Sequence, residues 1–216
     1  MTVKKIADMA ERDQVYTTPK EFVLGGMMDT GGVAHDSAIL TASSKPLIPT
    51  GMAISICFCM GDYTAEIEQI YAGLTDQPPH TEKQKVMAKK TIELYLATFK
   101  HYDYKRTFEL VDENYKQHSQ LVADGRDSII EASKILKSIA AKHWTGLGEP
   151  HFNMMFKRIL VDGDYVVAQI LSERWPGDEG EHVFDLYRWK NGRVVEHWDV
   201  IQQVDLANIK HGNSVA

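Results

Sequence analysis

The periodicity of apolar residues changes once along the chain, near residue 150. Before that point apolar side chains recur every three or four positions, as on one face of a helix, and after it they alternate with polar ones, as on a strand. The first helical stripe consists of Ala88, Ile92, Leu96 and Phe99. It predicts a helix of about 20 residues after the proline pair 78–79, where Thr81 and Gln84 form a T-x-x-Q capping box.

A second long helix is predicted between residues 123 and 142. Its buried stripe consists of Ile129, Ala132, Leu136 and Ile139. Either Asp127 or Ser128 can cap its start. A shorter helix is expected around 104–111, and another over 62–74, where Gly73 ends it.

Strand-like runs follow at 152–161, 165–175, 182–189 and 194–204. Asp-Gly between the first two runs and Asn-Gly between the last two are typical of hairpin turns. Helices followed by an antiparallel meander indicate an α+β fold, with the helices on the concave face of a curved sheet.

The proline pair also divides the chain into unequal parts. We predict an N-terminal extension over 1–80, a domain over 81–206 and a C-terminal tail over 207–216. The extension contains a glycine-rich stretch, 24–32, and one short candidate strand, 53–59. Its role stays open between an arm over a neighbouring subunit, a lid and a partly disordered extension.

The last hairpin places ionisable residues among apolar ones. A three-residue loop, 190–192, would set Trp189 opposite Arg193, Tyr187 opposite Val195, Asp185 opposite His197 and Val183 opposite Asp199. On this register Asp185, His197 and Asp199 share an otherwise apolar face. A two-residue turn would instead move Asp185 opposite Trp198 and onto the other face from His197, so the register is the step on which the site depends.

Two carboxylates beside one imidazole point to proton chemistry. An unpaired carboxylate on an apolar face costs several kcal/mol or acquires a raised pKa, whereas a carboxylate next to an imidazole can share protons and hydrogen bonds. Such a group can act as an acid or base near neutral pH. The residues alone leave two other interpretations open: a satisfied structural network inside the sheet, and a patch that faces solvent.

Composition and charge argue against several classes of partner and location. The chain has 216 residues and a formal net charge of −6, without a basic run, which argues against a nucleic-acid or anionic-membrane partner. The first twenty residues lack the apolar core of a signal peptide, and the longest apolar stretch, 46–61, is too short and too interrupted for a bilayer. The two cysteines, Cys57 and Cys59, are expected to be reduced. We therefore expect a cytoplasmic protein.

Three motifs carry a resemblance to a known family: VADGRDSIIEA at 122–132, FKRILVDGDYVVAQ at 156–169 and FDLYRWKNGRVVEHWDVIQ at 184–202. Over residues 84–204 the sequence resembles the SnoaL-like polyketide cyclases of the nuclear transport factor 2-like superfamily. The resemblance implies a cone in which a strongly curved antiparallel sheet packs on N-terminal helices around a pocket. It also implies a homodimer formed through the sheet.

The resemblance further implies a site and a chemistry. Asp199 matches the aspartate that serves as general acid/base in a cofactor-free, metal-free aldol ring closure of a carbonyl substrate, which is lyase- or isomerase-like chemistry. Asp185 and His197 would be its neighbours. Val183 and Tyr187 on the same face, His118 in the segment that matches the family's QHNP, and Gln169, where some members have histidine, would bind the substrate. The Asn-Pro that usually follows the Gln-His pair is absent here.

Two other functions remain as alternatives. A dimeric domain of this kind could bind a hydrophobic small molecule without catalysis. His197 and Asp199 also have the spacing of two ligands of a two-histidine, one-carboxylate metal site. The second histidine would have to be His211, the one histidine further downstream.

Overall fold

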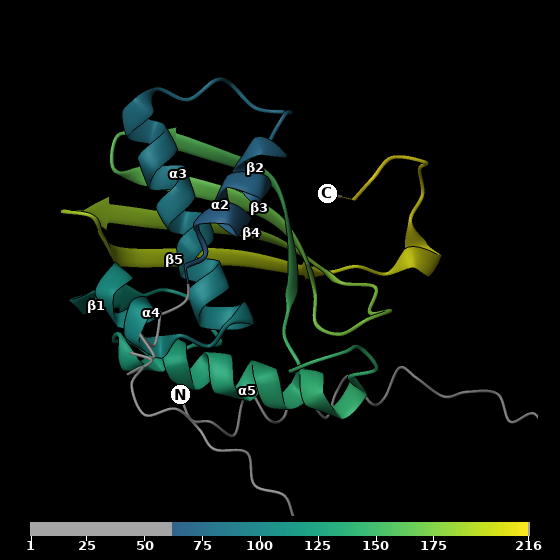
Figure 1. Ribbon diagram of the computed structural model, residues 1–216. Coiled ribbons are helices and arrows are strands. Elements are labelled where there is room, and N and C mark those ends of the chain that lie inside the picture. The colour runs from purple at the N-terminus through teal and green to yellow at the C-terminus, as the bar shows by residue number, and fades with distance from the viewer. Residues whose placement is uncertain (1–61, 216) are drawn as a thin grey trace, which may run out of the picture.

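The computed structural model describes residues 62–215, which form an α+β domain. The elements are α2 (Thr64–Ala72), α3 (Glu82–Tyr95), the π-helical turn η2 (Leu96–Lys100), α4 (Tyr104–Leu110), β1 (Val111–Gln117), α5 (Asp127–His143), β2 (Asn153–Asp162), β3 (Tyr165–Glu173), β4 (Glu181–Lys190), β5 (Arg193–Gln203) and the 3-10 turn η3 (Leu206–Asn208). Helices α2 and α3 lie over one face of the sheet, and α5 crosses below them (Figure 1). None of the helices in this range has the length and apolar character to cross a membrane.

The sheet has the strand order β1-β5-β4-β3-β2. Strands β2 to β5 form the predicted antiparallel meander. β1 pairs with β5 in parallel, so the sheet is mixed and the expectation of a purely antiparallel sheet is corrected. This strand was not predicted because Val111 and Tyr115 are its only buried residues, so its side chains do not alternate between apolar and polar.

Helix α3 begins as the sequence predicts. The Thr81 hydroxyl accepts the backbone N–H of Gln84 at 3.4 Å, and the Thr81 N–H donates to Gln84 Oε1 at 2.8 Å. The helix continues into η2, which gives the expected length, and Ala88 and Ile92 of its apolar stripe are fully buried. The Gln84 side chain also donates to the carbonyl of Val161 on β2 at 2.8 Å, which ties the helix start to the sheet edge.

Residues 62–80 pack against the domain. Helix α2 ends before Gly73 as predicted. His80 bonds Tyr71 Oη through Nδ1 at 3.0 Å and donates Nε2–H to the carbonyl of Ile159 at 2.8 Å, while the Ile159 N–H donates to Gln77 Oε1 at 2.8 Å. These side chains cover backbone groups of the edge strand β2, which would otherwise be open to another strand. The rest of the predicted extension, including 24–32 and 53–59, lies outside the described residues.

The β4–β5 hairpin has a register that differs from the predicted one. Its loop contains two residues, Asn191 and Gly192, both at positive φ (52° and 77°), as in a type I′ turn, and Lys190 faces Arg193. This turn is favoured because its twist matches that of the strands. A bulge then shifts the pairing between Arg188 and Trp189 on β4, so that residue 195 of β5 has no direct partner.

With the two-residue turn alone, Asp185 and His197 would lie on opposite faces of the sheet. The extra residue of the bulge returns them to the same face. Asp185 faces Asp199, Tyr187 faces His197 and Val183 faces Ile201. The predicted partners of Val183, Asp185 and Tyr187 were therefore wrong by two positions, and that of Trp189, which faces Val194, by one. The predicted common face of Asp185, His197 and Asp199 is correct, because a shift of two positions leaves every side chain on its own face.

Helix α5 differs from its prediction at its start and on its apolar face. Neither Asp127 nor Ser128 caps it: the residue before the helix is Arg126, and the Ser128 hydroxyl donates to the carbonyl of Gly125 at 2.5 Å. The fully packed positions are Ile130, Ser133 and Ala140. The predicted stripe of Ile129, Ala132, Leu136 and Ile139 is half-buried and lines a cavity.

Candidate active site

A cavity of about 450 Å³ lies between the inner face of the sheet, the end of α3 and helix α5. Its wall is largely apolar: Leu94, Phe99, Leu121, Val122, Ile129, Ala132, Leu136, Ile139, Phe152, Met154, Ile170, Val183 and Ile201 all line it. Its polar lining includes Asp185, His197 and Asp199, which we call the Asp–His–Asp cluster. Size and lining are those of a small-molecule pocket that orients a largely apolar ligand by a few polar groups.

The Asp–His–Asp cluster is held by the β4–β5 pairing. Each of its residues offers a side-chain atom that lies within 4.8 Å of the other two. His197 Nε2 is 3.1 Å from Asp185 Oδ1, and both side chains are buried. The His197 ring also stacks on the ring of Tyr187, with 4.5 Å between centroids. The three ionisable groups that the sequence singled out therefore meet at one place.

Tyr95 of α3 binds the other oxygen of Asp185. Its hydroxyl donates to Asp185 Oδ2 from a fully packed position. Burial, with the nearby Asp185 charge, holds the pKa of Tyr95 well above its usual value, so this hydroxyl stays protonated and remains a donor. Asp185 thus has a hydrogen-bond partner on each oxygen.

Gln117 of β1 determines which nitrogen of His197 carries hydrogen. The backbone N–H of Ser119 donates to Gln117 Oε1 at 3.0 Å, which identifies that atom as the amide oxygen. The same oxygen lies 2.9 Å from His197 Nδ1, so Nδ1 must be the donor. His197 therefore presents Nε2 to Asp185 Oδ1, at 3.1 Å.

Asp199 lies at the edge of the cluster, half-buried in the cavity wall. Burial raises the pKa of its carboxyl above the ordinary value, and the negative charge of Asp185 raises it further. A hydrogen bond from Ser119 and the charge of His197 act in the opposite direction. The net shift is upward, towards the range in which a carboxyl can both accept and deliver a proton.

Two residues predicted to bind the substrate lie on the other side of the sheet. His118 Nε2 is 2.9 Å from Glu196 Oε1, and its ring stacks on Trp198 with 4.6 Å between centroids. The Gln169 side chain accepts from Arg158 and lies 3.1 Å from His182 Nε2. Their placement follows from the alternation of side chains along a strand, and it does not fit contact with a ligand in the cavity.

Val183 and Tyr187 line the cavity as predicted, whereas Tyr95, Gln117 and Ser119 were missed. Gln117 and Ser119 flank His118, which the sequence motif had indicated as a ligand contact. Had residues 111–117 been identified as a strand, the alternation of its side chains would have pointed to these two positions instead. No local signal marks Tyr95, because it belongs to the apolar side of a helix and reaches Asp185 only through packing.

The Asp–His–Asp cluster is also the one group of three or more ligand-type side chains, within residues 62–215, that could reach a common metal ion. Its donor set of one imidazole and two carboxylates would suit a divalent transition metal. Its donor atoms are already engaged, however, since Asp185 Oδ1 faces His197 Nε2 and Tyr95 donates to Oδ2. His211 is exposed in the C-terminal segment and is not part of the cluster.

No family model matches the sequence, and neither does any curated protein. Solved structures to which the chain is similar include a candidate polyketide cyclase from Bacillus cereus, at 18% identity over 58% of this chain and 80% of that one, with a TM-score of 0.46. Bal32a from a soil-derived mobile gene cassette aligns at 21% identity over 56% and 92%, with a TM-score of 0.43. An NTF-2 like protein of unknown function from Burkholderia xenovorans aligns at 13% identity over 58% and 89%, with a TM-score of 0.41.

Proposed function

We propose that the cavity binds a hydrophobic carbonyl compound and that Asp199 acts as general acid/base in a cofactor-independent ring closure of the aldol type. The observation that carries this proposal is the position of the Asp199 carboxyl in a largely apolar cavity, beside His197 and opposite Asp185, where burial raises its pKa. A carboxyl buried at such a place destabilises the fold when it is ionised. Residues with such unfavourable pKa shifts are often found where a protein transfers protons.

The reaction would proceed through one carboxyl group that is regenerated. The Asp199 carboxylate removes a proton from the carbon next to one carbonyl, and the resulting enolate attacks the carbon of a second carbonyl in the same molecule. A carbon–carbon bond forms, and the new alkoxide takes the proton back from Asp199. General acid–base help of this kind contributes about 10²- to 10⁴-fold, and confinement of the folded substrate contributes further.

The neighbouring side chains have supporting roles. The contact between His197 and Asp185 holds the imidazole in place beside Asp199, and Gln117 fixes the imidazole from the other side. The apolar wall from α5 and the sheet lowers the local dielectric constant, which strengthens the electrostatic interactions within the cavity.

Binding without catalysis is the second candidate function. It is favoured by the way in which Tyr95, Asp185, His197 and Gln117 satisfy one another, because a purely structural network would need the same bonds. A dimer through the outer face of the sheet is compatible with either function and remains a proposal.

Asp199→Asn separates the two candidates. We expect the variant to bind aromatic diketones with little change and to lose about 10²- to 10⁴-fold in the rate of their ring closure, measured as single turnovers by mass spectrometry. Glu113→Gln, which changes an exposed carboxylate on β1, is the control and should retain the rate. Unchanged turnover in Asp199→Asn would reject the acid/base role, and binding with no turnover in either protein would favour the non-catalytic function.

A further inference from the structure

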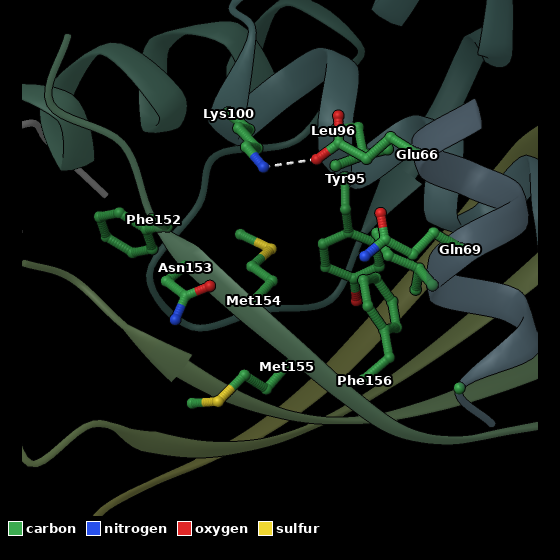
Figure 2. Close-up of a pocket in the computed structure, with 12 residues that line it drawn as sticks. Glu66, Gln69, Tyr95, Leu96, Lys100, Phe152, Asn153, Met154, Met155 and Phe156 are labelled. Carbon is green, nitrogen blue, oxygen red and sulfur yellow. Dashed lines mark hydrogen bonds and ion pairs between the residues drawn. The ribbon is translucent and has the colours of Figure 1, made fainter. Parts of the chain in front are cut away.

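A second hollow of about 440 Å³ lies between α2, the end of α3 and the start of β2, and we call it the α2 cleft (Figure 2). Ile70, Leu96 and Phe156 contribute to its apolar lining. The cleft exists because residues upstream of the proline pair fold back over the sheet edge. Residues of α2 line only this hollow and not the cavity of the candidate active site.

The α2 cleft and the cavity share part of their walls. Tyr95, Phe152 and Met154 line both hollows. Tyr95 is fixed by packing and by its bond to Asp185, and Phe152 is only 5% exposed. Met154 is half-buried and lies between these two rings in the view of Figure 2. Because a methionine has three rotatable bonds and no group that must stay hydrogen-bonded, it is the member of the shared wall that can move aside.

An irregular turn of helix borders the same cleft. At η2 the backbone N–H of His101 bonds to the carbonyl of Leu96 at 2.8 Å, a π-type bond, and both Leu96 and Lys100 of this turn line the cleft. Such turns are rare and often occur at functional sites. Lys100 forms an ion pair with Glu66 of α2, drawn as a dashed line in Figure 2. This half-buried pair gives the cleft a polar border without a net charge.

We propose that the cavity and the α2 cleft form one binding space divided by Met154, and that the ligand is an elongated carbonyl compound. Its carbonyl end would lie at the Asp–His–Asp cluster, and its apolar tail would pass Met154 into the α2 cleft towards Ile70 and Phe156. The position of the carbonyl end rests on the proposed function, whereas the course of the tail rests on the shared wall. The neutral polar border of the cleft fits an uncharged tail better than an ionised one.

The test is the affinity of linear alkyl phenyl ketones, from butyrophenone to decanophenone, measured by isothermal titration calorimetry. Each added methylene should raise the affinity about fourfold as long as the tail finds an apolar surface to cover. Gln69 is an exposed residue of α2 that lines the α2 cleft and not the cavity. Gln69→Trp should therefore leave butyrophenone affinity unchanged and lower decanophenone affinity about tenfold or more, which is the loss of roughly two buried methylenes.

Met154→Trp, which fills the shared wall, should have the same selective effect, and Met154→Leu should not. Leu160→Trp is the matched control, because Leu160 is an exposed residue of the same strand that lines neither hollow. Circular dichroism would verify that each variant folds, and Gln69→Trp alone carries the test if Met154→Trp does not.

Two results would separate this inference from the proposed function. Equal ratios of decanophenone to butyrophenone affinity in the wild type, Gln69→Trp and Leu160→Trp would overturn the shared binding space, even if ring closure depended on Asp199. A selective loss of long-chain binding in Gln69→Trp, with ring closure independent of Asp199, would retain the shared space and reject the acid/base role. Failure of every ketone to bind would overturn both.

Discussion

At the scale of single residues, the site depends on how a few buried polar groups satisfy one another. Gln117 orients His197, His197 and Tyr95 bind Asp185, and Asp199 remains with a raised pKa. Each of these groups would cost free energy if it were buried alone. Their arrangement therefore acts as a unit, and removing one member should affect the partners that it leaves behind.

Asp199→Asn should make the folded protein more stable at pH 7. Burial raises the Asp199 pKa above its ordinary value of 3.8, so the folded state binds this proton more tightly than the unfolded state does. The free energy of unfolding accordingly falls as the pH rises from 3.8 through the raised pKa, and the penalty persists at neutral pH. Urea midpoints should favour the variant at pH 7 and converge with the wild type in acid. A wild type more stable than Asp199→Asn at pH 7 would contradict the shift.

Gln117→Leu should destabilise the fold by about 1–3 kcal/mol, because it leaves the buried Nδ1–H of His197 without an acceptor. Gln117→Glu keeps an oxygen at that position and is the conservative control. Urea unfolding measures the stability, and ¹⁵N shifts of the imidazole identify the protonated nitrogen. Wild-type spectra with hydrogen on Nε2 alone would show the assignment to be wrong.

At the scale of elements, short local signals decide where helices and strands begin and how they pair. The capping box starts α3 at the predicted residue, and two positive φ angles at Asn191 and Gly192 close the β4–β5 hairpin. The bulge opposite Trp189 matters as much as the turn, because without it Asp185 and His197 would lie on opposite faces.

Thr81→Ala should lower the free energy of unfolding by about 1 kcal/mol, since it removes the acceptor for the Gln84 N–H at the start of α3. Thr81→Ser retains a hydroxyl and should lose much less. Urea denaturation followed by circular dichroism measures both. Equal stability of Thr81→Ala and the wild type would mean that solvent replaces the cap without cost.

At the scale of the whole molecule, the two faces of the sheet have different environments. The inner face holds the core and the cavity. On the outer face Phe184 and Val200 lie directly opposite each other and are 42% and 69% exposed, with Leu160 and Tyr165 exposed on the neighbouring strands. Apolar side chains gathered on an open sheet face are typical of a surface that another protein covers, which supports the proposed dimer.

Val200→Glu should convert that dimer to a monomer, because it places a charge at the most exposed apolar position of this face. Sedimentation velocity distinguishes the two states. Val86→Glu changes a residue of α3 that is 56% exposed and should leave the assembly intact. A wild type that sediments as a monomer at all concentrations would reject the proposal.

Much of the fold could be predicted because its signals are local. Periodicity located α2 to α5 and β2 to β5, and the residues of the last hairpin identified Asp185, His197 and Asp199 as a group. Predictions that depended on which residues pack together in the folded chain were wrong. β1 has too few buried residues to be recognised alone, and His118 was chosen although Gln117 and Ser119 point into the cavity.

The sequence by itself determined which residues could form helices, strands and turns, since these depend on side-chain periodicity and on backbone preferences within a few positions. Only the tertiary structure decided which of them meet. The bulge in β5, the parallel pairing of β1 and the packing of Tyr95 against Asp185 join residues up to 90 positions apart in the chain. The stripe of α5 likewise faces a cavity rather than a filled core, and no local pattern records the space left between two elements.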